Sequence, residues 1–279
     1  ILGRIVPSRW LASPPDTSTG RGAIRPEAFG GFERFLAGAA RFNHDLRCYE
    51  DVLGFVAQVR DAGRRRELVA KAFPRGIDSP AFDDLLRIPL YGYQREGVLF
   101  AARAGRCLIG DEMGLGKTIQ AVAAVEILAR HFGVERVLVV CPTSLKHQWE
   151  REIARFIDRP VEVVGGPLAA RAASFAADGF YKITNYDTVH RDLEAIRAWS
   201  PDLVILDEAQ RIKNWATRTA RSVKQITSPY AIVLTGTPLE NRLQELVSIV
   251  QFVDQHRLGP TFRFLHDHET VGEGGRVIG

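Results

Sequence analysis

A segment with the composition of a phosphate-binding loop covers residues 110–118, Gly-Asp-Glu-Met-Gly-Leu-Gly-Lys-Thr. It follows a short apolar run and opens a helical pattern from Ile119 to Arg130, which is the strand, glycine loop and helix order that such a loop requires. Asp111 stands where the general pattern GxxxxGK[ST] has its first glycine. On these residues alone, the segment is either a nucleotide site or an ordinary glycine-rich turn.

The residue types in this loop suit the binding of phosphate. Gly114 and Gly116, on either side of Leu115, permit a sharp turn in which backbone N–H groups and the helix N-terminus face phosphate oxygens. Lys117 would reach the β- and γ-phosphates, and the Thr118 hydroxyl would ligate Mg²⁺. We therefore predict that these five residues bind a nucleotide with Mg²⁺.

Two adjacent carboxylates, Asp207 and Glu208, come directly after the apolar run 203–206. Parallel strands present their carboxyl ends to the ligand crevice, so these side chains would meet the glycine loop. Asp207 would then hold the hydration shell of the Mg²⁺ that Thr118 contacts, and Glu208 would orient and deprotonate the attacking water. The alternative is a plain acidic helix N-cap after a strand.

Two other strand candidates run into hydroxyl-rich turns, at residues 140–145 (VCPTSL) and 234–238 (LTGTP). Taken alone, each is ordinary turn chemistry. Both follow apolar runs, as the glycine loop and the carboxylates do. They become informative only through their order along the chain.

The elements that would position these residues alternate between short β-branched runs and longer helical stretches after about residue 86. This alternation is typical of βαβ units around a parallel sheet. Six strands are expected, at residues 107–109, 137–140, 161–164, 181–184, 203–206 and 231–234. The predicted fold class is α/β, a parallel sheet flanked by helices.

The remainder of the chain is predicted to form flanking segments. Residues 1–41 are rich in proline and glycine and are expected to be an irregular lead-in. Apolar positions in the helical accessory region, residues 42–85, predict two amphipathic helices that are interrupted at Gly63 and ended by Pro74. The nucleotide-binding lobe covers residues 86–258, and residues 259–279 would begin a linker or insertion.

In chain order, these segments reproduce the first half of the superfamily 2 helicase motif set. Tyr93 and Gln94 precede the loop, and the later motifs read DEAQ at 207–210, IKN at 212–214 and LTGTPLEN at 234–241. With these motifs, residues 88–258 resemble the Swi/Snf family of helicase-like, DNA-dependent ATPases. The resemblance implies a RecA-like P-loop NTPase lobe of a motor that moves along double-stranded DNA and remodels nucleoprotein complexes.

The resemblance also implies roles for single residues in ATP hydrolysis. Gln94 matches the glutamine that reads the adenine edge, so ATP would be preferred to GTP. Lys117 and Thr118 match the phosphate lysine and the hydroxyl that coordinates Mg²⁺. Asp207 and Glu208 match the Mg²⁺-linked acid and the catalytic base.

A second group of residues is implied to connect ATP with DNA. Thr235 and Thr237, together with Gln210, match positions that couple the ATP state to the grip on DNA. Backbone N–H and hydroxyl groups of two further segments would contact phosphates without reading sequence. These segments are Pro142-Thr143 and Thr184-Asn185-Tyr186. For Tyr186, a core aromatic is an equally good interpretation.

Motors of this family have a second RecA-like lobe, which supplies further DNA contacts and an arginine finger. Nothing after Asn241 resembles such a lobe. An arginine finger accelerates hydrolysis by about 10³–10⁵-fold, so we expect this chain alone to bind ATP but to hydrolyse it poorly. The absence of an initiator Met and the glycine-rich end suggest a piece of a longer polypeptide.

Composition excludes several classes of protein. The 279 residues are 46% hydrophobic and 25% charged, as in globular rather than disordered or fibrous chains. No apolar run reaches the roughly 18 residues of a membrane helix. Three widely spaced cysteines argue against a disulfide scaffold or a zinc ribbon.

Arginine makes up 31 of the 37 basic residues. This content permits a polyanionic partner and fits a GC-rich gene. We therefore expect a cytoplasmic, nucleoid-associated bacterial protein.

Two other functions stay open on the sequence. A strand-separating helicase acting on DNA or RNA has the same nucleotide chemistry, so the glycine loop and the carboxylates do not distinguish it from a translocase. Residues 212–214 and 239–241 favour the translocase by resemblance. The second alternative is a nucleotide-regulated scaffold without turnover, which the intact loop lysine and carboxylates disfavour.

Overall fold

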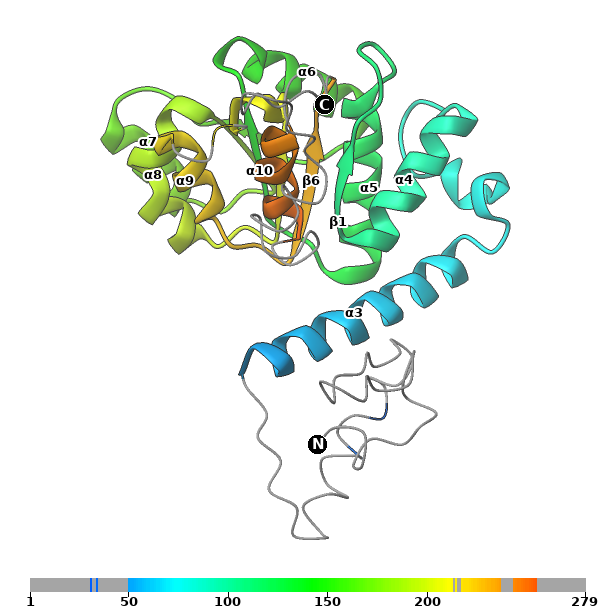
Figure 1. Cartoon of the computed structure of the whole chain (residues 1–279). Helices are drawn as coiled ribbons and strands as arrows, with labels where there is room; N and C mark the ends of the chain where they lie inside the picture. Colours follow the sequence, from blue (N-terminus) through cyan, green and yellow to red (C-terminus); the bar gives the residue numbers. More distant parts are fainter. Residues whose placement is uncertain are drawn as a thin grey trace, which may run out of the picture. The chain divides into compact units, whose positions relative to one another are not determined.

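Six parallel strands form one sheet in the order β1-β6-β5-β2-β4-β3 (Figure 1). The strands are β1 Arg106–Ile109, β2 Val137–Cys141, β3 Val161–Val163, β4 Tyr181–Asn185, β5 Leu203–Leu206 and β6 Tyr230–Leu234. Every predicted strand is present, with each end displaced by no more than one residue. The α/β class and the parallel sheet flanked by helices are therefore confirmed.

In this computed structural model, the described residues are 31, 34, 50–212, 214, 217–236 and 243–254. The chain divides into two units, residues 1–67 and 68–279, and every strand of the sheet belongs to the second. Most of the predicted lead-in, the predicted linker after residue 258 and Thr237 lie outside the described residues. The domain boundaries stay predictions.

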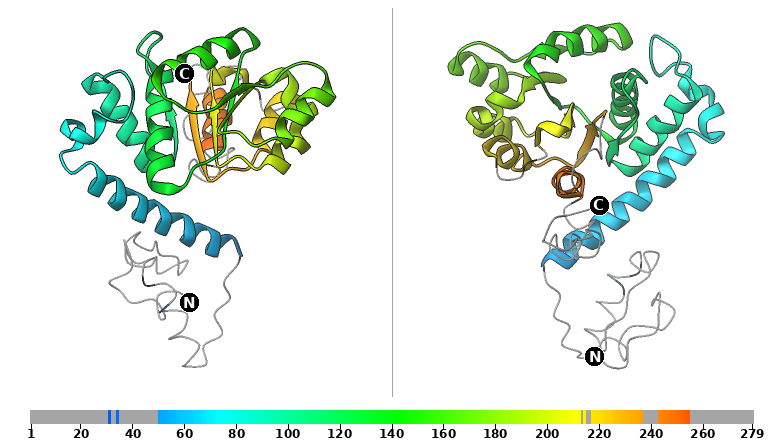
Figure 2. Two further views of the ribbon diagram at one scale, coloured as in Figure 1. Left: turned by 180° about the vertical axis from the view of Figure 1, so that it is seen from behind. Right: turned by 45° about the horizontal axis from the view of Figure 1, so that its top comes forward.

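Helices cover both faces of the sheet, as the views in Figure 2 show. On one face lie α4 Gly92–Ala104, α5 Lys117–Phe132 and α6 Lys146–Phe156. On the other lie α7 Leu168–Ala176, α8 Tyr186–Trp199, α9 Arg218–Lys224 and α10 Leu243–Val253. Four 3₁₀ turns are described: η3 Gly76–Asp78, η4 Pro80–Phe82, η5 Thr143–Leu145 and η6 Ala209–Ile212. None of the helices in the described residues is long and apolar enough to cross a membrane.

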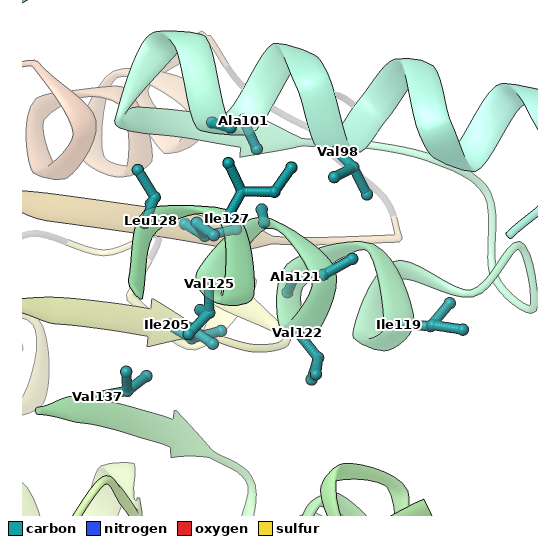
Figure 3. Packing of buried hydrophobic residues seen from close by; sticks show 14 of the residues in the cluster. Val98, Ala101, Ile119, Ala121, Val122, Val125, Ile127, Leu128, Val137 and Ile205 are labelled. Carbon is teal, nitrogen blue, oxygen red and sulfur yellow. The ribbon is translucent and has the colours of Figure 1, made fainter. Parts of the chain in front are cut away.

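Helix α5 is the centre of the larger core cluster and is buried continuously from Ile119 to Leu128. In Figure 3, Val98 of α4 and Ile205 of β5 lie on opposite sides of α5. A buried Val, Leu or Ile contributes about 1.5–3 kcal/mol relative to an exposed one. This packing fixes the axis of α5, and with it the glycine loop at the N-terminus of the helix.

The prediction of two N-terminal helices is wrong, because a single helix, α3 Glu50–Ala72, continues through Gly63. No atom of the described residues lies within 4 Å of a Cβ built on Gly63. A glycine in a helix interior costs about 1 kcal/mol relative to alanine, which the 23 residues of α3 tolerate. The helix ends just before Pro74, as expected.

Candidate active site

The predicted glycine loop lies between the carboxyl end of β1 and the N-terminus of α5. Gly114 and Gly116 have left-handed backbone conformations, with φ of 86° and 74°, that only glycine adopts without steric cost. Gly116 is the N-cap of α5, and no side chain of the described residues caps the N-terminus of this helix. Its first N–H groups are thus available to an anion, which is the arrangement that binds phosphate.

Hydrogen bonds to the backbone of the glycine loop hold the side chain of Lys117 in place. Its Nζ donates to the carbonyl oxygens of Asp111 and Glu112, each at 2.9 Å. A bound phosphate would replace these contacts with stronger charge-assisted hydrogen bonds. Asp111 stands in the place of the first glycine of the general pattern. Its carboxylate accepts a hydrogen bond of 2.8 Å from Gln120 Nε2, so a residue of α5 stabilises the aspartate at this position.

Gln94 joins α4 to the glycine loop and is only 5% exposed. Its Oε1 accepts from the backbone N–H of Tyr91 at 3.0 Å, and its Nε2 donates to the Leu115 carbonyl oxygen at 3.3 Å. The exposed rings of Tyr91 and Tyr93 stack beside it with centroids 6.0 Å apart. The glutamine predicted to read adenine therefore contacts the loop predicted to bind phosphate.

Asp207 follows the central strand β5 and is 9% exposed. Its Oδ2 accepts from Trp149 Nε1–H at 2.8 Å, and its Oδ1 accepts from the backbone N–H of Glu208 at 2.9 Å. Burial raises the pKa of Asp207, and the Glu208 charge raises it further, whereas the Trp149 hydrogen bond and the Lys117 charge lower it. The charges of Lys117 and Glu208 thus act on this carboxyl in opposite directions.

Sequence reasoning missed Trp149, which lies in α6 and is 2% exposed. The available signal was general: an indole N–H in a core needs an acceptor. The two hydrogen-bond donors hold the Asp207 carboxylate in one orientation, at the carboxyl edge of the sheet. Thr118, at the start of α5, is partly exposed. One carboxylate and one hydroxyl are oxygen ligands that fit Mg²⁺, which usually takes its other ligands from phosphates and water.

Glu208 has a left-handed backbone, with φ of 50°. Such a conformation costs a non-glycine residue about 1–3 kcal/mol and persists only when its surroundings enforce it. Gln210 Nε2 donates to Glu208 Oε2, while Gln210 Oε1 accepts from Thr235 Oγ1 at 3.2 Å. The structure thus brings together the predicted base and two of the three predicted coupling residues.

The segment after β6 also contacts the glycine loop directly. Thr235 is 1% exposed, and its backbone N–H donates to the Ile109 carbonyl oxygen at 3.2 Å, at the end of neighbouring β1. A Cβ built on Gly236 would lie 2.9 Å from Met113 Cγ and 3.9 Å from Lys117 Nζ. A side chain at position 236 would therefore have to displace the exposed Met113 side chain of the glycine loop.

The first predicted DNA segment is accessible. Pro142, between β2 and η5, is partly exposed, and Thr143, the first residue of η5, is exposed. This turn lies at the same carboxyl edge of the parallel sheet as the loop and the acids. Its backbone and hydroxyl groups are therefore positioned at the surface, as the prediction of phosphate contacts requires.

The prediction for the second DNA segment needs correction, because its three side chains are buried. Thr184 Oγ1 lies 3.1 Å from Thr188 Oγ1, and Asn185 Oδ1 caps α8 by accepting from the Thr188 N–H at 3.0 Å. The Tyr186 hydroxyl donates to the Asp207 carbonyl oxygen at 2.7 Å, which supports the core interpretation of this tyrosine. These side chains serve the fold, and only their backbone stays a predicted DNA contact.

Comparison with known proteins agrees with this geometry. The SNF2-related domain matches residues 93–270, which is more than half of the chain. The chain belongs to the SNF2-related domain family. The match covers the glycine loop, the carboxylates and the segment after β6, so these residues form part of an SNF2-family ATPase core, whose nucleotide is ATP.

Relatives of this SNF2-family chain include bacterial and eukaryotic proteins. It is 36% identical over 203 residues to YwqA of Bacillus subtilis (strain 168), named as a candidate ATP-dependent helicase/translocase; the match covers 70% of this chain and 22% of YwqA. It is 31% identical over 199 residues to the DNA repair and recombination protein RAD54B of Gallus gallus, covering 64% of this chain and 22% of RAD54B. The chain thus spans about a fifth of these relatives.

A solved structure resembles this SNF2-family chain as well. It is the SWI2/SNF2 ATPase core of Sulfolobus solfataricus in complex with double-stranded DNA, with a TM-score of 0.60 and 30% sequence identity. The similarity covers 65% of this chain and 39% of that chain. It agrees with the α/β sheet and its flanking helices.

Proposed function

We propose that this chain is the ATP-binding first lobe of a DNA-dependent ATPase that translocates on double-stranded DNA and remodels nucleoprotein complexes. The observation that carries the proposal is the hydrogen-bonded series from Thr235 through Gln210 to Glu208, beside the glycine loop. A scaffold that only binds nucleotide does not need hydrogen bonds between the predicted catalytic base, Glu208, and the segment after β6 that lies beside the glycine loop. The double-stranded DNA in the related Sulfolobus structure supports duplex DNA as the partner.

The residues of the site suit ATP hydrolysis in separate roles. Lys117 exchanges its two loop carbonyls for phosphate oxygens, and the uncapped N-terminus of α5 offers N–H groups to the same phosphates. Glu208 takes a proton from the attacking water, and the Gln210 hydrogen bond orients its carboxylate. When bound, Mg²⁺ neutralises charge on the phosphates, and Asp207 and Thr118 are the residues that would hold it.

DNA contact is proposed for the exposed turn at Pro142 and Thr143 and for the backbone at residues 184–186. Such contacts reach phosphate and sugar, so binding is expected to ignore sequence and to weaken steeply with salt. A second RecA-like lobe, as the relatives' greater length permits, would complete the DNA cleft and supply an arginine finger. We propose that the intact protein acts on DNA in the bacterial cytoplasm.

Displacement of a third DNA strand tests translocation. The complete protein should remove a triplex-forming oligonucleotide from duplex DNA in an ATP-dependent manner, and its Lys117→Ala variant should not. A partly single-stranded duplex, tested in parallel, should stay paired. Strand separation without triplex displacement would favour the helicase alternative, and neither reaction despite ATP binding would favour the scaffold.

A further inference from the structure

Two buried aromatic residues hold Asp207 from opposite faces of the sheet. Trp149, in the core cluster under α4, α5 and α6, donates its indole N–H to Asp207 Oδ2 at 2.8 Å. Tyr186, in the cluster under α8, α9 and α10, donates its hydroxyl to the Asp207 carbonyl oxygen at 2.7 Å. One hydrogen bond therefore fixes the carboxylate and the other fixes its backbone.

Each aromatic residue is joined by a short stretch of chain to a proposed DNA contact. Trp149 lies in α6, which continues directly from η5 and the Pro142-Thr143 turn. Tyr186 is the first residue of α8 and follows Thr184 and Asn185 at the end of β4. A displacement of either segment by DNA would move a donor that contacts Asp207.

We infer that Trp149 and Tyr186 are positioning residues that transmit DNA binding to the Mg²⁺-linked acid Asp207. The inference rests on the proposed function, since it concerns how DNA and nucleotide influence one another. Burial makes the two hydrogen bonds consequential, because a buried polar group that loses its partner pays the full cost of desolvation. A shift of α6 or α8 cannot be absorbed by water at these atoms, so Asp207 must follow its donors.

The contrast with two other buried aromatic residues supplies matched controls. Among the described residues, the Trp199 indole N–H and the Tyr181 hydroxyl are buried and have no hydrogen-bond acceptor. Trp199→Phe and Tyr181→Phe thus remove the same atoms as Trp149→Phe and Tyr186→Phe, but they break no hydrogen bond to Asp207. Differences between the two sets of variants report on the contacts to Asp207 rather than on lost aromatic volume.

The experiment measures thermodynamic coupling in the complete protein. A fluorescent, non-hydrolysable ATP analogue is titrated with Mg²⁺, in the absence and presence of saturating duplex DNA, and DNA affinity is measured without nucleotide. In the parent we expect duplex DNA to change analogue affinity by about 5–150-fold, the usual range for coupled sites. In Trp149→Phe and Tyr186→Phe the change should fall below about twofold, at duplex concentrations that saturate each variant. DNA affinity without nucleotide should stay near that of the parent in Trp149→Phe.

The two control variants show whether a loss of coupling comes from the contacts to Asp207. Trp199→Phe and Tyr181→Phe should keep the parent's coupling. Full coupling in Trp149→Phe and Tyr186→Phe, or equal loss of coupling in the controls, would overturn the inference. If Trp149→Phe does not fold, as judged by circular dichroism, Tyr186→Phe alone decides. If the parent itself shows no response to DNA, the proposed function fails, and the inference that rests on it fails with it.

Discussion

Replacing Gly116 with alanine should weaken nucleotide binding through two separate effects. The first is backbone strain, because φ at Gly116 is 74°. The second is a collision, because the new Cβ would lie 2.6 Å from Gln94 Nε2. Gly114→Ala provides a matched control, since φ there is 86° but no atom in the described part of the chain lies within 4 Å of the added Cβ.

The sizes of the two effects can be separated. An L-residue in the left-handed region costs about 1–2 kcal/mol, which corresponds to about a 5–30-fold loss of affinity if nucleotide must restore the strained loop. Both variants share this loss. Displacement of Gln94 removes its hydrogen bond to Leu115 and its predicted bond to adenine. A net hydrogen bond contributes about 0.5–1.5 kcal/mol, so Gly116→Ala should lose a further 2–12-fold, approximately, for ATP alone.

Titration with fluorescent ATP and GTP analogues measures both effects. Gly114→Ala should lower the affinities for both nucleotides by the same factor and keep the parent's preference for ATP. Gly116→Ala should lower ATP affinity more than GTP affinity, and thus reduce the preference. An unchanged preference in Gly116→Ala would refute the role of Gln94 in reading adenine, whereas parent-like affinity in both variants would refute the phosphate loop.

The other predictions concern catalysis and stability. Lys117→Ala should abolish productive ATP binding in a nucleotide titration, because Lys117 is the cation held over the loop. Glu208→Gln should keep nucleotide bound while turnover collapses, since the amide cannot take a proton; equal loss of both would make Glu208 structural. Residues 1–279 alone should bind ATP yet hydrolyse it near background, and adding a second lobe should raise turnover by about 10³-fold or more. Arg171→Met leaves the buried Asp192 carboxylate without its ion-pair partner, so it should lower the free energy of unfolding by about 3–5 kcal/mol in urea titrations. The double variant Arg171→Met, Asp192→Leu should recover part of this loss.

The strands and the chemical motifs could be predicted from the sequence because their signals are local. The run 203–206, for example, is apolar with two β-branched residues, and Asp207 and Glu208 follow it directly. Since parallel strands end at one edge, Asp207 and Glu208 were expected near the glycine loop; in the structure the two acids follow β5 and the loop follows β1, at the same edge of the sheet. The roles of these residues in catalysis stay predictions.

What could not be predicted depends on contacts between distant segments. Trp149 and Asp207 are 58 positions apart, so only the sheet order, with β5 beside β2, brings α6 to the acid. Tyr186 was equally compatible with a surface and a core role until its hydroxyl was seen at the Asp207 carbonyl. Gly63 suggested a helix end, but a local propensity of about 1 kcal/mol is too weak to stop a long helix.

The rate of ATP hydrolysis by the complete protein, with and without duplex DNA, tests the central proposal most directly. We predict that several unrelated duplexes raise turnover to a similar extent, that salt weakens this stimulation, and that Lys117→Ala abolishes turnover under all conditions. A turnover rate that depends on Lys117 but does not respond to any duplex would contradict a DNA-dependent ATPase.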